Sequence, residues 1–94
     1  MSAQTDYLRQ ELNNAKAALN NESLRRAAVA AIDTGLDLLS SRDNLEAAGV
    51  VLPAMDTAIV AAIYDPVKTA VDARNGADVT IKDKATILTE LSAL

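Results

Sequence analysis

The spacing of apolar positions predicts that the chain is built from helices. In residues 3–19 the apolar positions recur at intervals of four, three and four residues, which places them on one side of a helix. These positions are Leu8, Leu12, Ala15 and Leu19. The remaining positions carry mostly polar side chains. Because the apolar stripe is narrow, we expect a peripheral helix over residues 3–19 that covers one neighbour.

Two asparagines, Asn20 and Asn21, interrupt this pattern. On a continuous helix the next apolar stripe would lie about 140° around from the first, at about 100° per residue. One straight helix cannot present both stripes to a single core. The simplest interpretation is an αα-hairpin in which Asn21 caps a second helix over residues 22–40, and a long bent helix is the alternative.

The second helix is apolar over roughly 220° of its circumference, so we expect it to lie at the centre of the fold. Only a narrow face carries charges, and Asp33 and Asp37 both lie on it. Ala27, Ala31 and Gly35 recur every four residues. A row of small residues lets a neighbouring backbone approach closely, so this row predicts a close helix crossing.

Turn and capping residues divide the rest of the chain. The polar run 40–43 predicts a break, followed by a short helix that ends before Gly49 as its C′ residue. Pro53 and Pro66 each suit the first position of a helix, and Asp65 suits the cap before Pro66. The expected helices cover residues 43–48, 53–64 and 66–75, the last as a new helix or as a kinked continuation of the one before it.

The last helix is predicted over residues 81–93. Asn75 and Gly76 end the helix before it, and Thr80 and Asp83 stand at the spacing of a capping box. No internal repeat or low-complexity tract divides the sequence. We therefore expect a single all-α domain over residues 1–94, folded as a compact bundle of four to five helices.

Composition narrows the chemistry that this chain can perform. It contains no Cys and no His, which removes thiolate nucleophiles, zinc–thiolate sites and the side chain best suited to proton transfer at neutral pH. Ser and Thr have no His to activate them, and the Asp33 and Asp37 pair is expected to be solvated. We therefore expect no enzymatic activity, no cofactor and no metal.

Three familiar motifs are matched poorly. Residues 47–64 approach the length of a membrane span but contain Asp56, Gly49 and Pro53, so a buried central helix is the better interpretation. Residues 72–83 lack the glutamate and the glycine register of a calcium loop. Ala31 and Gly35 resemble the centre of a DNA-binding helix-turn-helix, but acidic residues follow them. We expect no nucleic-acid partner.

Elimination leaves protein binding as the expected function. The leading hypothesis is a self-associating structural or assembly subunit, because the second and third helices carry more apolar surface than a thin first helix can cover. The candidate interaction residues are Ala27, Ala31, Gly35, Met55, Ile59 and Ile63. An acidic inhibitor or adaptor with one heterologous protein partner is the alternative, and a membrane-active protein ranks third.

The setting in which the protein acts is open. The net charge is −4, and no basic run or secretory signal is visible, so the cytoplasm is the default location. Small Ala-rich helical chains without Cys or His are typical of bacterial and bacteriophage accessory and virion proteins, so the virion is a second expected location.

Overall fold

Four helices make up the described part of the chain in the computed structural model, which covers residues 3–19, 26–73 and 81–94. They are α1 (Ala3–Ala18), α2 (Arg26–Ala47), α3 (Thr57–Asp72) and α4 (Lys84–Ser92). No strand occurs in these ranges. The structure confirms the all-α bundle that the sequence predicts.

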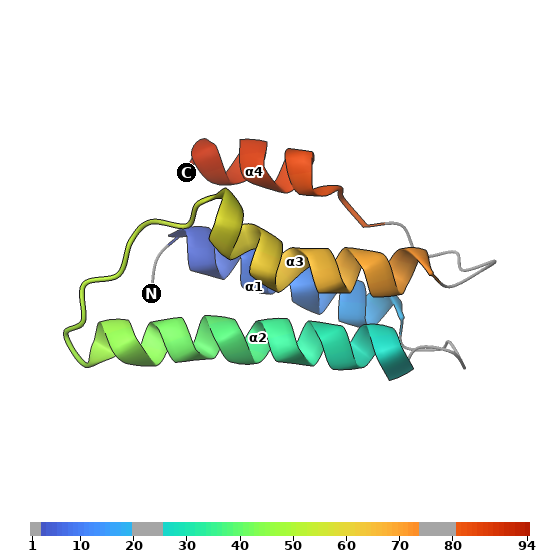
Figure 1. Ribbon diagram of the computed structural model, residues 1–94, viewed down its shortest axis with the longest axis horizontal. Helices are drawn as coiled ribbons and strands as arrows, with labels where there is room; N and C mark the ends of the chain where they lie inside the picture. Colours follow the sequence, from blue (N-terminus) through green and yellow to red (C-terminus); the bar gives the residue numbers. More distant parts are fainter. Residues whose placement is uncertain (1–2, 20–25, 74–80) are drawn as a thin grey trace.

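The described helices form an antiparallel ring in which α1 packs on α2, α2 on α3, α3 on α4, and α4 on α1 (Figure 1). Contacts between α1 and α2 pair Arg9 with Asp43 and Lys16 with Asp33, so the two helices run in opposite directions. This arrangement is a hairpin of two separate helices, as expected. Asn20 and Asn21 lie outside the described residues, as does the cap that we assigned to Asn21.

The expected peripheral position of α1 is wrong. Its apolar stripe is fully buried, with Leu8, Leu12 and Leu19 at 0% exposure and Ala15 at 4%. The stripe faces the common axis of the bundle, so the flanks of α1 meet two neighbours instead of one. At the end of the bundle, the Gln4 side chain donates to the Leu91 carbonyl at 3.3 Å and ties the start of α1 to α4.

The polar run at residues 40–43 does not break α2, so a separate helix over 43–48 is wrong. Ser40 and Ser41 are exposed to solvent, whereas Arg42 and Asp43 are held by other parts of the chain. The Arg42 guanidinium donates to the Pro53 carbonyl at 2.6 Å, and Asp43 pairs with Arg9. Because these polar side chains are exposed to solvent or bind other residues, they do not compete for the backbone hydrogen bonds of the helix.

Gly49 is a helix C′ residue as predicted, although the helix that it ends is α2 and not a separate helix over 43–48. Its φ of +90° is the left-handed conformation that glycine adopts without strain. The Gly49 N–H donates to the Glu46 carbonyl and the Val50 N–H donates to the Leu45 carbonyl, both at 3.0 Å. These two bonds form a Schellman motif, which satisfies carbonyl groups at the end of the helix.

Neither proline begins a helix, so a helix start at Pro53 and a new helix at Pro66 are both wrong, and the helix continues through Pro66. Helix α3 begins at Thr57 rather than Pro53, because the carboxylate of Asp56 caps it by accepting from the Ile59 N–H at 3.0 Å. Pro66 lies inside α3 and starts no new helix. A proline removes one backbone donor, and burial of the neighbouring Val67 at 0% exposure helps to hold the helix together across that position.

Helix α4 begins at Lys84, later than expected. The Asp83 carboxylate accepts from the Thr86 N–H at 2.8 Å, so Asp83 is the cap itself and not the N3 residue of a capping box that begins at Thr80. Thr80, the cap that the sequence suggested, lies outside the described residues. The end of the preceding helix at Asn75 and Gly76 also lies outside them.

The close crossing predicted for the row of small residues occurs at Gly35, which is buried. A Cβ atom at this position would lie 3.1 Å from Leu12 Cδ1, 3.2 Å from Ile63 Cγ2 and 3.4 Å from the Ile63 carbonyl oxygen. Gly35 therefore lets α1, α2 and α3 meet in the core. Ala31 is half-buried and Ala27 is exposed, so the close approach is confined to one position.

Replacing Asp56 by alanine is expected to lower the free energy of unfolding by about 1 kcal/mol, the usual cost of losing an N-cap. In a domain of this size, that loss lowers the melting temperature by about 4–8 °C. Asp56→Asn keeps an acceptor oxygen and should melt close to the native chain. Thermal unfolding followed by circular dichroism checks both variants, and equal losses would contradict the capping role.

Candidate functional site

An apolar surface lies along the outer side of α2 and α3. On α2, Leu38, Arg42 and Leu45 recur at spacings of four and three residues, so they share one side of the helix. Leu38 is 43% exposed and Leu45 is 46% exposed. The neighbouring Leu39, by contrast, is buried at 0% exposure. Exposed leucines of this kind are informative where they form part of a larger apolar patch.

The matching side of α3 carries apolar residues at spacings of three, four and four. We define the α2–α3 face by ten residues of these two rows: Ala27, Ala31, Thr34, Leu38, Arg42, Leu45, Ile59, Ala62, Pro66 and Ala70. A hollow of about 210 Å³ lies between the rows, and Ile63 closes it from the core side. Within the face, Arg42 is the one charged residue.

Arg42 is held in place within this surface. Its Nη2 atom donates to the Pro53 carbonyl, while its Nε atom is covered and has no partner among the described residues. Arg42 lines the hollow together with the apolar side chains of Leu38, Ile59 and Ala62. Its side chain combines an apolar stem with a polar tip.

Apolar side chains continue past the end of α2. Val50 is 45% exposed and Val51 is 95% exposed. The bond from the Val50 N–H to the Leu45 carbonyl keeps this segment against the last turn of α2. The exposed apolar surface is thus concentrated toward the C-terminal half of α2.

The six candidate residues from the sequence are divided between surface and core. Ala27, Ala31 and Ile59 lie on the α2–α3 face, where Ala27 is exposed and the other two are half-buried. Ile63 lies beneath it at 4% exposure. Gly35 is buried at the helix crossing, and Met55 is buried near α1, with its N–H donating to the Gln4 side chain at 3.2 Å.

Sequence reasoning missed Leu38, Leu45 and Arg42. A signal was available, because an apolar arc of roughly 220° is wider than the stripe that one helix normally buries. The residues at the edge of such an arc must stay exposed unless another chain covers them. The edge itself becomes visible only when the neighbours of α2 are known.

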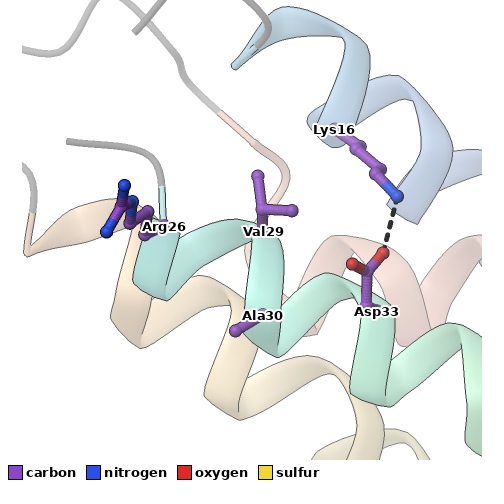
Figure 2. Close-up of a pocket in the computed structure, with 5 residues that line it drawn as sticks. All are labelled: Lys16, Arg26, Val29, Ala30 and Asp33. Carbon is purple, nitrogen blue, oxygen red and sulfur yellow. Dashed lines mark hydrogen bonds and ion pairs between the residues drawn. The ribbon is translucent and has the colours of Figure 1, made fainter. Parts of the chain in front are cut away.

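A second hollow, of about 420 Å³, opens between the end of α1 and the start of α2 (Figure 2). Lys16 reaches from α1 to Asp33 on α2, and the two charges pair at 2.6 Å. Arg26, Val29 and Ala30 complete the described lining. Because Lys16 and Asp33 neutralise each other, these side chains form an open depression without a nucleophile or an acid–base pair.

The densest polar cluster ties the segment before α4 to α1. The Lys82 ammonium lies 2.9 Å from a carboxylate oxygen of Glu11 and 2.9 Å from one of Glu90. It also lies 5.5 Å from the centre of the Tyr7 ring, a cation–π distance. The Tyr7 hydroxyl donates to Glu90. Each charge has a partner, so the cluster fastens α4 to α1.

The pKa values of two groups in this region, Tyr64 and Asp83, are shifted further from pH 7. Burial raises the pKa of Tyr64 to about 12, and the nearby carboxylates act in the same direction. The Tyr64 hydroxyl donates to the Lys82 carbonyl. The Thr86 backbone N–H lowers the pKa of Asp83 by donating to its carboxylate. A catalytic acid or base needs a pKa near the working pH, so neither shift prepares proton transfer at pH 7.

The titration of Tyr64 provides a test of its burial. Tyr7→Phe leaves Tyr64 as the single tyrosine, and its ultraviolet absorbance should titrate with a midpoint near 12 instead of the ordinary 10. Between these values the unfolded chain loses the tyrosine proton while the folded chain keeps it, so stability falls as the pH rises. A midpoint near 10 in a chain that circular dichroism shows to be folded would contradict the buried environment.

Other chemistry considered from the sequence can be compared with the structure. Residues 47–64 span the end of α2, an irregular connector and the start of α3, so they do not form one continuous helix. Within the described ranges, no helix has the length and hydropathy needed to cross a membrane. Gly35 continues α2 instead of forming the turn of a helix-turn-helix.

A calcium loop between α3 and α4 falls mainly outside the described residues, which stop at 73 and resume at 81. At its ends, Asp72 pairs with Lys68 at 3.1 Å and Asp83 caps α4. The described part of the chain contains no group of three or more His, Cys, Asp or Glu side chains that could hold a metal ion.

Comparison with known proteins finds no match for this chain among protein families, curated protein sequences or solved structures.

Proposed function

We propose that this protein is a non-catalytic structural or assembly subunit that associates with copies of itself through the α2–α3 face. One observation carries the proposal: Leu38 and Leu45 are nearly half exposed on one side of α2, and Leu38 shares a hollow with Ile59 and Ala62 in which Arg42 is the one charged lining residue. Single exposed apolar residues are ordinary on protein surfaces, but a contiguous apolar patch marks an interaction site.

Self-association is the form of binding that these residues favour. A 94-residue chain has a small core relative to its surface, and a repeated subunit can cover its remaining apolar area by sharing it. The small side chains of Ala27, Ala31 and Ala62 would also let a second helical surface approach closely. Assembly of a phage or other virion is the biological setting that the composition suggests for such a subunit.

The melting temperature measured against protein concentration tests this proposal. Binding to the native state alone stabilises it by mass action, so a self-associating chain melts at a higher temperature when it is concentrated. For a dimer, we expect the melting temperature to rise by a few degrees for each tenfold increase in protein concentration. Such an increase stabilises the folded dimer by about 1.4 kcal/mol per mole of dimer. A constant melting temperature would overturn self-association and favour a heterologous partner.

A further inference from the structure

Side-chain size changes along the α2–α3 face. Its large residues on α2, Leu38, Arg42 and Leu45, lie in the C-terminal half of the helix. Its small residues on α2 are Ala27, Ala31 and Thr34, all in the N-terminal half. Because α3 runs antiparallel to α2, Ile59 lies beside the large half, where it shares the hollow with Leu38, whereas Ala70 lies toward the small half. Both helices thus give the face one bulky end and one flat end.

The face is large enough for a small dimer interface. The 22 residues of α2 extend for about 33 Å and the 16 residues of α3 for about 24 Å, and each helix is about 10 Å wide. Each copy would therefore contribute roughly 570 Å², and two copies would bury about 1,100 Å² together. A specific protein interface buries more than about 1,000 Å² in total, so this face lies at the lower end of the range, where reversible association is typical.

From this gradient we infer a two-fold dimer in which α2 of one copy lies antiparallel to α2 of a second copy. The inference rests on the proposed function. The two-fold axis passes near residue 36, the midpoint of the face along α2. Leu45 then packs on Ala27 of the second copy, and Leu38 packs near Thr34. The bulky end of each copy thus meets the flat end of the other, so the contact occurs twice in the dimer. Pairing large with small side chains avoids voids and clashes between packed layers.

The charge on the face favours the same orientation. With the axis near residue 36, the two copies of Arg42 lie about 18 Å apart along the helices. That separation is more than four times the roughly 4 Å between charges placed side by side, and Coulomb repulsion falls in inverse proportion to distance. A parallel arrangement would instead place the two guanidinium groups side by side and the two Leu45 side chains against each other.

Disulfide cross-linking tests the orientation, because the chain contains no native cysteine. Ala27→Cys and Leu45→Cys are made as separate variants, mixed and oxidised. A disulfide requires Cα atoms within about 7 Å, and the two positions are about 27 Å apart within one chain. The antiparallel dimer predicts mixed disulfides in excess of either homodisulfide. Ala31→Cys with Ser41→Cys is a second pair of the same register, and the exposed Gln10→Cys is the control.

The outcomes separate the orientation from the proposed function. If the wild-type chain has the mass of an oligomer but homodisulfides dominate, the antiparallel orientation is wrong. The same conclusion holds if neither mixed pair exceeds the Gln10→Cys control in an oligomeric chain. If the wild-type chain has the mass of a monomer at every concentration, the proposed function and this inference both fail.

Discussion

Replacing Gly35 by leucine is expected to destabilise the bundle by about 1–3 kcal/mol, the usual cost of overpacking a core. A Cβ atom alone would already lie 3.1 Å from Leu12 and 3.2 Å from Ile63, and a leucine adds three further heavy atoms. The melting temperature should fall by about 4–24 °C, since each kcal/mol shifts it by about 4–8 °C in a small domain. Differential scanning calorimetry measures the shift.

Two variants show whether the loss comes from the helix crossing. Gly35→Ala gains about 1 kcal/mol of helix propensity, which offsets the small shift of the neighbouring side-chain tips, so its stability should stay within about 1 kcal/mol of the native chain. Ala18→Leu adds three of the same four carbon atoms at an exposed position of α1 and should change little. A Gly35→Leu variant as stable as Ala18→Leu would disprove the close packing of three helices.

Replacing Leu38 by lysine is expected to separate the proposed assembly into monomers while leaving each chain folded. Leu38 is 43% exposed in the isolated chain, so its own bundle tolerates a charge there. In the assembly the new ammonium group would be buried beside Arg42, four residues further along the same side of α2. Burying an unpaired charge in an interface costs several kcal/mol, so the dissociation constant should rise at least about a hundredfold.

Gln10→Lys is the matched control for this substitution. It adds the same charge to α1 at an exposed position away from the α2–α3 face. Sedimentation velocity of both variants, with circular dichroism to verify folding, compares their association directly. If Leu38→Lys associates as strongly as Gln10→Lys, the contact surface lies elsewhere on the molecule.

The parts of the fold that sequence predicted well depend on local rules. The spacing of leucines in residues 3–19 identified a helix and its buried side, because one narrow stripe leaves few alternatives. Gly49 identified a helix end, because helices often end at a position with positive φ and glycine adopts that conformation most readily. Its φ is +90°. Capping and periodicity act within one or two turns, so they can be read without knowing the neighbours.

The errors arose where contacts distant in sequence override local preference. The polar run at residues 40–43 stays helical because Pro53 and Arg9 supply partners for Arg42 and Asp43. Pro66 is accommodated within α3, where neighbouring side chains are buried in the core. Pro53 lies 11 residues from Arg42 and Arg9 lies 34 residues from Asp43 in the sequence, so no local pattern reveals these contacts.

The candidate surface could be predicted in part. The apolar excess of the second helix pointed to Ala27 and Ala31, and Ile59 was selected from the third. Gly35 and Ile63 were selected with them, although both are buried. The sequence alone does not show whether a small or apolar residue faces the core or a partner. Burial distinguishes the two, and it follows from the arrangement of all four helices.

The mass of the purified wild-type chain in solution, measured by light scattering over a dilution series, tests the central claim most directly. A single chain has a mass of 9.9 kDa. Self-association through the α2–α3 face predicts a mass of about twice that value at high concentration, which falls toward the single-chain value on dilution by mass action. A mass of 9.9 kDa at every concentration would contradict the account.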